Sequence, residues 1–424
     1  MERLPLLFSS ALAVGAGATL IACGGGSEPS SSPASAPVAA PAPAPAAAPS
    51  LTREVLSVPG GLSSPWDLAF LPDGSMLITE KCAGLSIVRN GARTRLFGTA
   101  GSQTVASDLF CVGQSGILGV AVDPDFGGGN RFVYVFMSSN ATTPRRNRVV
   151  RLTLAADLQG VSGRTDIVDD IAFKHAGNAV GAAGAHSGGR LRFGVAAGDR
   201  YLYVTTGDNH SAPLPQSPVA PLGGKVLRVT RDGTAAPGND PPPGFDARIF
   251  TFGHRNVQGI AFRPGSGQPF ISEHGPNHSD EVTALAAGGN GGWDPRDRPN
   301  LTCPDGYCGY AGNASTMPMT DTARFPAAML PSWTNDGASQ GMGPATFLSG
   351  AQWKAWDGRL AVGIMGGQRI EILTLDAAGF ATATTTATAT NGSLEARIRS
   401  LVQGPDGNLY VLTDSNQLWR IVPG

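Results

Sequence analysis

Five short polar clusters contain the residues of this sequence whose types and spacing could do chemistry. Each of them lies beside a predicted strand or in a predicted turn, where side chains can project from a rigid framework. The clusters are Ala185–Arg190, Thr206–Asn209, Gly253–Gly259, Glu273–Glu281 and Ala396–Arg399. Two of the five indicate a ligand from their residue types alone.

Arg397 and Arg399 are two positions apart in a predicted strand, so their side chains point to the same side. Two guanidinium groups on one side repel each other unless an anion lies between them. Arginine is well suited to bidentate recognition of carboxylates, so the pair indicates a polyanionic ligand. The alternative is two surface arginines that meet carboxylates of the protein itself.

The loop Glu273–Glu281 is rich in oxygen atoms, and Gly275-Pro276 within it exposes main-chain carbonyl groups. Hard oxygen ligands at an irregular turn are typical of a Ca²⁺ site. A solvated acidic turn is the alternative for the same residues.

Two other patterns resemble catalytic motifs but lack the necessary structural context. Gly337–Gly341 matches G-x-S-x-G, but Gly343-Pro344 follows and no helix pattern appears after the serine. His274 and His278 are four residues apart, as in a metalloprotease helix. Gly275-Pro276 between them would interrupt that helix, so the facing geometry is lost.

The segments around the clusters predict strands, because short β-rich runs alternate with Pro-Asp-Gly-like turns. A phrase of two apolar strands joined by a turn, followed by a short strand, recurs six times. Its copies begin at Trp66, Gly119, Arg190, Gly259, Ala345 and Ile398. Self-similarity at a period of roughly 40–60 residues is typical of a propeller. We therefore predict an all-β fold, a six-bladed β-propeller, in preference to a multi-sheet sandwich.

Taken in order, the motifs resemble those of the sugar dehydrogenases that depend on pyrroloquinoline quinone (PQQ), the soluble glucose, aldose and sorbosone dehydrogenases. The resemblance runs from about Leu56 to the C-terminus, and that family has a six-bladed propeller. The matching segments are Pro65–Gly74 with Thr79–Glu80, Gly113–Gly119, His186–Arg190, Gly207–Asp208, Gly253–Asn256, Glu273–Pro276, Arg397–Arg399 and Pro405–Gly407.

The resemblance implies an enzyme that oxidises an aldose-type sugar at its anomeric carbon to a lactone, with hydride passing to the quinone. His186 would be the general base for the anomeric hydroxyl, a task that suits an imidazole with a pKa of about 6.5. Asp208 would orient and support that imidazole. Arg255, together with Ca²⁺, would stabilise negative charge developing on the quinone oxygens.

The resemblance also implies which residues bind the cofactors, PQQ and Ca²⁺. Asn256 would contact the quinone, and Arg397 and Arg399 would clamp the carboxylates of PQQ. Gln114 would lie at the sugar side of the cofactor site. The main-chain carbonyls of Gly275 and Pro276 would be ligands of the calcium ion.

The sequence departs from the family pattern in four places. A lysine that often contacts the cofactor is missing from Ile364–Gln368, and no aromatic residue in Ser339–Pro344 matches the one that packs on the quinone. Trp333 is a candidate for that packing role if its loop folds back. Asn290–Asp294 lacks the tyrosine of the corresponding family run, and the loop around Cys303–Cys308 resembles an insertion.

These departures keep two other functions open. The first is a non-catalytic propeller lipoprotein that binds sugar or serves as a scaffold. The second is a calcium-dependent lactonase, which would need carboxylates from several blades at one metal ion. The expected partners are a small-molecule sugar and an electron acceptor of unknown identity. A net charge of −1 and a pI near 6.6 give no reason to expect nucleic acid.

The N-terminal segment predicts export. Residues 1–22 contain Arg3 and an apolar run from Leu4 to Ala22, which is typical of a signal peptide, and Cys23 follows as in a bacterial lipobox. A short transmembrane anchor or an ordinary signal peptide is the alternative. Residues 23–50 predict a disordered tether, and residues 51–424 form the predicted propeller. We expect lipidated Cys23 to hold the protein on the periplasmic side of a membrane. Gly24 favours the outer membrane over the inner one.

Four cysteines remain after Cys23, an even number that indicates disulfides in an exported chain. Three pairings are possible, and we favour Cys82–Cys111 with Cys303–Cys308. A zinc site at Cys303 and Cys308 is the alternative, but no second short cysteine pair completes four ligands.

Overall fold

The computed structural model describes residues 47–175, 181–310 and 317–424 of the chain. The predicted signal peptide (residues 1–22), the lipidation site Cys23 and residues 23–46 of the predicted tether lie outside the described residues. The first described strand, β1, begins at Leu51. No helix in the described part of the chain is long and apolar enough to span a membrane.

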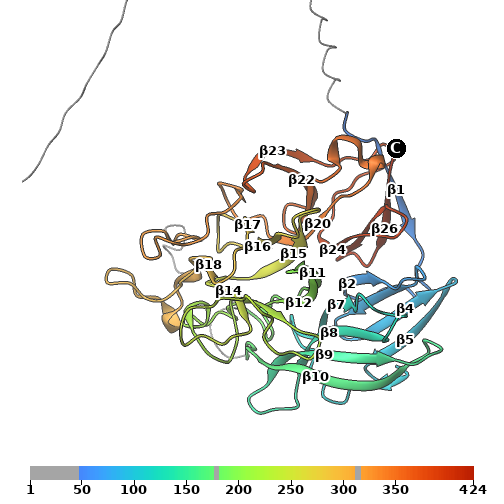
Figure 1. Cartoon of the computed structure of the whole chain (residues 1–424), viewed down its shortest axis with the longest axis horizontal. Helices are drawn as coiled ribbons and strands as arrows, with labels where there is room; N and C mark the ends of the chain where they lie inside the picture. The colour runs from blue at the N-terminus through green and yellow to red at the C-terminus, as the bar shows by residue number, and fades with distance from the viewer. Residues whose placement is uncertain (1–46, 176–180, 311–316) are drawn as a thin grey trace, which may run out of the picture. The chain divides into compact units, whose positions relative to one another are not determined.

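The described strands form six sheets, which are the six blades of a β-propeller (Figure 1). The predicted fold class is therefore confirmed, and each predicted repeat begins in, or one residue before, the innermost strand of a blade. In chain order the blades are β2 Pro65–Phe70, β3 Met76–Glu80, β4 Gly84–Arg89, β5 Ala92–Gly98 and β6 Thr104–Val105; β7 Ile117–Val122, β8 Phe132–Ser139, β9 Arg146–Leu154 and β10 Val161–Ile171; β11 Leu191–Ala196, β12 Asp199–Thr205, β13 Lys225–Val229, β14 Ile249–Phe252 and β18 Gly289–Asn290; β15 Val257–Phe262, β16 Pro269–Glu273, β17 Glu281–Ala284 and β19 Trp333–Thr334; β20 Met342–Phe347, β21 Leu360–Ile364, β22 Arg369–Leu375 and β23 Ala381–Thr386; and β24 Ile398–Gln403, β25 Leu409–Thr413, β26 Leu418–Pro423 and β1 Leu51–Leu56. Short 3₁₀ turns lie at η1 Leu214–Gln216, η2 Pro304–Gly306, η3 Cys308–Tyr310 and η5 Ala351–Trp356.

The last blade is completed by the first strand, which closes the ring. β1 pairs antiparallel with β26, with Leu51 opposite Pro423, and the backbone N–H of Gly424 donates to the carbonyl of Ser50 at 2.8 Å. The colours in Figure 1 follow the blades around the ring, and blue β1 lies beside red β26. This pairing supplies the outermost strand of the last blade and ties the first described strand to the last one.

Two of the repeated turns show why the sequence folds in this way. In Pro72-Asp73-Gly74 and Pro405-Asp406-Gly407 the glycine has a positive φ of 82° and 76°, a conformation that side chains disfavour. The aspartate accepts the N–H two residues on, at 2.9 Å from Ser75 and 3.1 Å from Asn408. Proline fixes the entry to the turn, so both hairpins have the same geometry.

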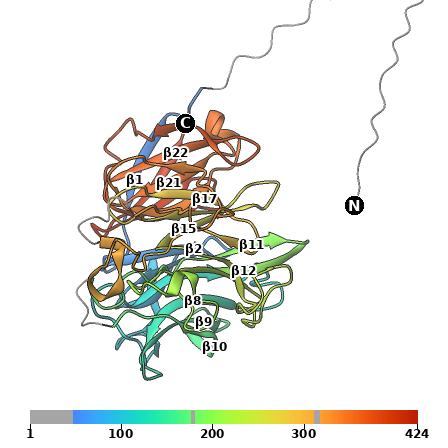
Figure 2. The same cartoon turned by 90° about the vertical axis from the view of Figure 1, so that its left-hand side faces the viewer.

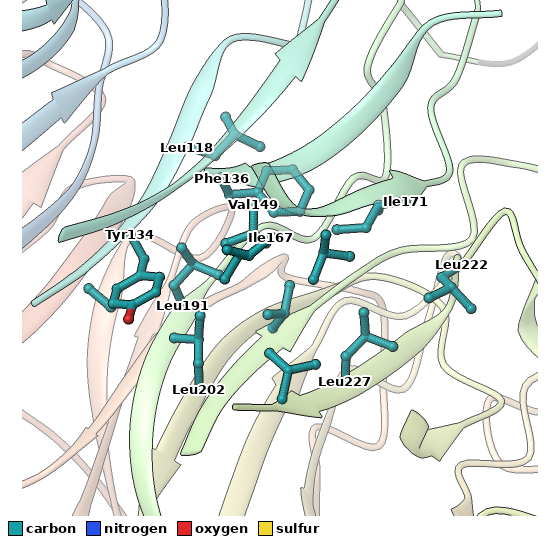
Figure 3. Close-up of a cluster of buried hydrophobic side chains, with 14 of the residues drawn as sticks. Leu118, Tyr134, Phe136, Val149, Ile167, Ile171, Leu191, Leu202, Leu222 and Leu227 are labelled. Atoms are coloured by element: carbon teal, nitrogen blue, oxygen red, sulfur yellow. The ribbon is translucent and has the colours of Figure 1, made fainter. Parts of the chain in front are cut away.

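The blades are held together by apolar side chains packed between neighbouring sheets. Figure 3 shows one such layer, where Leu118, Tyr134 and Val149 of the β7–β10 blade meet side chains of the next blade. All three are at most 2% exposed, and burying one such side chain contributes about 1.5–3 kcal/mol. The side view in Figure 2 shows β8, β9 and β10 in sheet order within this blade. These layers fix each blade relative to the next and so position the loops at the ends of the strands.

Both favoured disulfides are present, Cys82–Cys111 and Cys303–Cys308. The first bridge joins the loop after β3 to the segment before β7. The second bridge closes a tight loop between β18 and β19. Because Cys303 and Cys308 are bonded to each other, the alternative of a zinc site with two thiolate ligands is wrong.

Candidate active site

A cavity of about 630 Å³ opens at one end of the central channel. Most of its lining residues share one of two positions. They lie either just before or at the start of an innermost strand, or just after the second strand of a blade. The first group includes Trp66, Gln114, His186, Asn256 and Arg397, and the second includes Lys81, His210, His274, Met365 and Asp414. The polar clusters therefore converge because the ring brings the same strand ends of successive blades together.

His186 and Asp208 form a hydrogen-bonded dyad at the wall of this cavity. Nδ1 of His186 lies 2.7 Å from Oδ1 of Asp208, and His186 is 7% exposed. Burial lowers the pKa of His186 well below its ordinary value, and the nearby charges of Arg255, His274 and Lys174 act in the same direction. The imidazole is therefore neutral at pH 7. Because its Nδ1–H donates to the carboxylate, it presents the Nε2 lone pair as a proton acceptor.

Asp208 is fully buried, and its carboxylate accepts three further hydrogen bonds from the described residues. The backbone N–H of His210 donates to Oδ1 at 3.0 Å, the indole Nε1 of Trp293 to Oδ2 at 2.8 Å, and the hydroxyl of Tyr307 to Oδ2 at 2.7 Å. These donors satisfy the buried charge and hold the carboxylate in one orientation. One oxygen consequently remains directed at the imidazole.

Arg255 lies behind the cavity wall and is fully buried. Its guanidinium donates to the carbonyl of His274 at 2.6 Å and to the hydroxyl of Tyr310. The same hydroxyl lies 3.2 Å from Nε2 of His186, so Tyr310 connects the imidazole with the guanidinium. The backbone N–H groups of Arg255 and Asn256 donate to the Glu273 carboxylate, which fixes this turn.

Asn256 lies in the cavity lining, and its amide oxygen has a defined set of donors. It accepts from the N–H of Gly188 at 3.2 Å and from the side chain of Gln258 at 3.0 Å. Gln114 also lines the cavity, on the exposed side.

Arg397 and Arg399 both line the cavity, but the anion between them is a residue of the protein. Asp414 forms ion pairs with both guanidiniums, at 2.8 Å for Nε of Arg397 and 2.9 Å for Nη2 of Arg399. Burial alone would raise the pKa of Asp414, but the two arginines hold it below its usual value. The pair by itself therefore does not require a ligand, and that inference from same-side repulsion is corrected.

Lys81 adds a third cation to the same wall, where it donates to the carbonyl of Gly113 at 3.1 Å. Burial and the charge of Arg399 lower its pKa, whereas Asp414 acts in the opposite direction. Three cationic side chains thus face one carboxylate, an excess of two positive charges. This wall can bind a ligand that carries more than one negative charge.

Gly275 and Pro276 are buried directly after cavity residue His274, outside the cavity lining itself. The Asp280 carboxylate shapes their loop, because it accepts from the N–H groups of Gly275 and Gln340 at 2.8 and 2.6 Å. Within the described residues, no hydrogen bond ends on the carbonyl oxygen of Gly275 or of Pro276. Two buried carbonyl oxygens without donors are suitable ligands for a hard cation.

Among the residues that the structure describes, side-chain metal ligands do not converge at the cavity. In the described segments, the one group of three potential ligands is Asp297 with Cys303 and Cys308, and its two sulfurs form a disulfide. The several converging carboxylates that a calcium-dependent lactonase would need are therefore not found in this part of the chain.

The sequence interpretation missed Lys81, Tyr307 and Tyr310. Lys81 directly follows Thr79–Glu80, which match the family pattern. Its position after the second strand of a blade, where other cavity residues lie, could have identified it. The tyrosines lie in the segment interpreted as an insertion, which has no strand period. Trp333, the candidate stacking residue, is wrongly placed: it lies in β19, pairs with Val282 and packs against an apolar cluster of its own blade. Trp66 and Tyr310 are the large aromatic residues in the cavity lining.

Residues 62–420 match the glucose / sorbosone dehydrogenase family. The chain is 29% identical over 368 residues to the aldose sugar dehydrogenase YliI of Escherichia coli (strain K12), covering 85% of this chain and 91% of that protein. It is 28% identical over 274 residues to quinoprotein glucose dehydrogenase B of Acinetobacter calcoaceticus, covering 59% of this chain and 53% of that protein. A solved glucose dehydrogenase-type oxidoreductase of Thermus thermophilus superimposes with a TM-score of 0.66 at 31% identity, covering 88% of this chain and 100% of that one.

Proposed function

Because the chain belongs to the glucose / sorbosone dehydrogenase family, we propose that it oxidises an aldose-type sugar at the anomeric carbon to a lactone, with bound PQQ and Ca²⁺. One observation carries this proposal. The neutral His186 imidazole, held by Asp208, lines a cavity that Lys81, Arg397 and Arg399 also line. A base and a cationic wall in one cavity fit a sugar hydroxyl and an anionic cofactor.

His186 would accept the proton of the anomeric hydroxyl at Nε2. The Asp208 carboxylate would stabilise the imidazolium that results, because its Oδ1 already accepts a hydrogen bond from the Nδ1–H, with 2.7 Å between the two atoms. Positioned general bases of this kind contribute roughly 10²–10⁴-fold to rates. The Tyr310 hydroxyl contacts Nε2 in the structure. The sugar hydroxyl would either displace it from Nε2 or bind Nε2 beside it.

The residues present fit PQQ as a ligand. PQQ supplies the hydride acceptor when it is bound, and its carboxylates match the two surplus positive charges of Lys81, Arg397 and Arg399 against Asp414. The cavity volume of about 630 Å³ lies within the range of roughly 300–1,000 Å³ that is common for small-molecule sites. Asn256 would orient the ring system, and the buried Arg255 would stabilise negative charge beside it.

The residues near His274 also fit a calcium ion. The carbonyl oxygens of Gly275 and Pro276 would hold the ion, which would add positive charge beside the cofactor. Lys81 and Tyr310 weaken the argument for a non-catalytic scaffold, since they place a cation and an aromatic ring in the cavity where the sequence pattern had suggested losses.

The cellular location that we propose follows from the predicted signal peptide and the cysteine after it. Lipidation at Cys23 would place the propeller on the periplasmic side of a membrane, with the outer membrane favoured, and its electrons would pass to an acceptor of unknown identity. The two disulfides of the propeller support an oxidising compartment.

The test is calorimetric titration of the purified protein with PQQ, with and without Ca²⁺, followed by dye reduction with a panel of aldoses. We expect Ca²⁺-dependent binding and sugar-dependent turnover that is abolished in His186→Ala. Absence of PQQ binding at high micromolar concentration would reject the dehydrogenase and favour the sugar-binding scaffold. Binding without turnover of any aldose would reject the proposed substrate class.

A further inference from the structure

The loop between β18 and β19 contains a disulfide, leads from the blade that carries the dyad to the next blade, and contacts the dyad. It contains Trp293, then Cys303–Cys308, with Tyr307 inside the bridge. Trp293, Tyr307 and Cys308 are 0%, 4% and 0% exposed and pack in one apolar cluster with both cysteines. The described part of the loop is therefore packed into the protein and is not an exposed surface loop.

This loop supplies both side-chain donors to Oδ2 of Asp208. The Tyr307 hydroxyl donates at 2.7 Å and the Trp293 indole at 2.8 Å, while the Nδ1 of His186 is bonded to Oδ1. The two oxygens of the carboxylate thus have different partners: Oδ2 accepts hydrogen bonds from the loop, and Oδ1 accepts one from the imidazole of the proposed base. Burial and the Asp208 charge raise the pKa of Tyr307 well above its ordinary value, so its hydroxyl stays a donor.

We propose that Tyr307 is a positioning residue of the His186–Asp208 dyad, and that the Cys303–Cys308 bridge holds it on Asp208. This inference rests on the proposed function, in which His186 is the base. With Oδ2 occupied, Asp208 can turn only Oδ1 toward the imidazole, which fixes the proton on Nδ1 and leaves the Nε2 lone pair facing the cavity. The loop that resembled an insertion therefore sets the tautomer of the base.

The bridge restricts where the Tyr307 ring can lie. Tyr307 directly precedes Cys308, whose backbone N–H donates to the carbonyl of Pro295 at 2.7 Å, and the N–H of Cys303 donates to the Asp297 carboxylate at 3.0 Å. Gly309 packs directly against the Tyr307 ring. A Cβ added at this position would lie only 2.5 Å from Cε1 of the ring, so a larger residue would push the ring aside. Without the bridge only these two backbone hydrogen bonds would hold the ends of the turn, and we expect them to be too few to keep the hydroxyl on Asp208.

The direction of the expected pH effect follows from the groups that face His186. Arg255, His274 and Lys174 disfavour its protonated form, Asp208 favours it, and the His210 ring and the Tyr310 hydroxyl pack against it. Removing the Tyr307 hydroxyl takes one donor from Asp208, so more of the carboxylate charge acts on the imidazole. The pKa of His186 then rises, and the acid limb of the kcat/KM profile moves to higher pH.

The decisive variant is Tyr307→Phe, which keeps the ring and removes the hydroxyl. Tyr410→Phe is the matched control, since it removes the same kind of tyrosine–aspartate hydrogen bond, to Asp406 at 2.9 Å, away from the cavity. We expect kcat to fall about tenfold in Tyr307→Phe, the usual size for one hydrogen bond to a charged group. The acid limb should move to higher pH in Tyr307→Phe, and both quantities should stay at the wild-type value in Tyr410→Phe.

A spectroscopic readout on cofactor-free protein separates this inference from the proposed function. Nitrogen NMR of histidine-labelled protein reports the tautomer and the pKa of His186 without any turnover. We expect an Nδ1-protonated ring in the wild type, and a raised pKa with a mixed tautomer in Tyr307→Phe. A wild-type tautomer and pKa in that variant overturn the inference even if the enzyme is active, whereas the expected change supports it even if no sugar is oxidised.

A second pair of variants tests the role of the bridge. Cys303→Ser combined with Cys308→Ser should give the same shift in the His186 titration as Tyr307→Phe. The corresponding double variant at Cys82 and Cys111 should leave that titration unchanged. If Tyr307→Phe does not fold, Trp293→Phe removes the other donor to Oδ2 and should shift the pKa in the same direction. A bridge variant with a wild-type His186 titration would refute the coupling.

Discussion

Two fully buried carboxylates in the propeller, Asp67 and Asp208, have the same burial but different partners. Asp67 forms ion pairs with Arg190 at 2.6 Å and Arg192 at 2.8 Å and accepts the hydroxyl of Ser400 at 2.8 Å. These partners come from β11, β24 and the residue before β11, so Asp67 joins three blades. Asp208 instead accepts from an imidazole, an indole, a phenol and a backbone N–H.

The difference in partners separates a structural carboxylate from one suited to catalysis. Arginines keep their charge at every pH of interest, so the Asp67 cluster can only hold the blades together. The imidazole beside Asp208 can gain and lose a proton, and it borders a cavity. Burial alone therefore does not indicate function, whereas a titratable partner at a cavity wall does.

Asp208→Asn should produce the largest effect on activity. An asparagine in this place can donate to Nδ1 of His186 and favour the wrong tautomer, so kcat should fall on the order of 10³–10⁴-fold. Steady-state dye reduction with PQQ and Ca²⁺ measures the loss, and urea unfolding of the same variant shows that it is folded. A kcat within about tenfold of the wild type would mean that Asp208 does not support the base.

Asp67→Asn should act mainly on stability. It leaves the buried guanidinium of Arg190 and the partly exposed guanidinium of Arg192 without their carboxylate, and breaking a buried ion pair such as the one to Arg190 costs about 3–5 kcal/mol. Urea unfolding at pH 7 measures the change. A loss below about 1 kcal/mol would show that the cluster does not hold the blades together.

The difference in free energy of unfolding between the wild type and Asp67→Asn should depend on pH in a defined direction. Burial would raise the pKa of Asp67, but Arg190 and Arg192 outweigh it and lower the pKa below its ordinary value of 3.8. The stabilisation is therefore complete above pH 3.8 and is lost as the pH falls through the lower folded-state value. The gap between wild type and Asp67→Asn should stay constant from neutral pH to about pH 4 and shrink below it.

The repeat predicted the blades because every blade needs the same strand and turn pattern, and the turns at Asp73 and Asp406 show that pattern in detail. The family resemblance pointed to His186, Asn256 and Arg397, and the repeat explains why they line one cavity, since equivalent strand ends meet at the channel. The closing strand β1 could not be predicted in this way, because it precedes the first repeat and pairs with the last.

The missed residues share a physical reason. Tyr307 and Tyr310 lie in a loop whose path is set by a disulfide and by packing, and neither leaves a periodic trace in the sequence. Asp414 likewise could not be assigned to the two arginines from spacing alone, because it arrives from the next strand of the blade. The sequence predicts which residue types reach the cavity, but the partner of each charge depends on the fold.

Lys81→Met should have a moderate effect that is confined to cofactor binding. It removes one of the three cations of the cavity wall, so the affinity for PQQ should fall about tenfold, the usual size for one charge-assisted contact. Calorimetric titration at two salt concentrations measures the loss and its screening. Lys354→Met is the control, since this lysine donates to the C-terminal Gly424 far from the cavity lining. An unchanged Kd would exclude Lys81 from the anion site.

A third buried carboxyl, Glu281, extends the comparison to a group that forms no ion pair within the described residues. It accepts the hydroxyl of Thr320 at 3.0 and 3.1 Å, and it pairs across β16 and β17 with Glu273. Burial, followed by the charges of Glu273 and Asp280, raises its pKa well above the ordinary value of 4.5. The folded protein therefore keeps a proton that the unfolded chain releases above pH 4.5.

Glu281→Gln should consequently stabilise the protein at high pH by a small amount. In the wild type, stability falls as the pH rises above 4.5, because the unfolded state binds fewer protons there. Glutamine keeps the shape and cannot titrate, so the variant should gain about 1 kcal/mol relative to wild type at pH 8 and little at pH 4. Urea unfolding at both values measures this gain. If the free energy of unfolding of the variant differed from that of the wild type by the same amount at pH 4 and pH 8, Glu281 would be charged in the folded state. Buried carboxylates here would then be ionised whatever their partners, and the distinction between Asp67 and Asp208 would have to rest on the cavity alone.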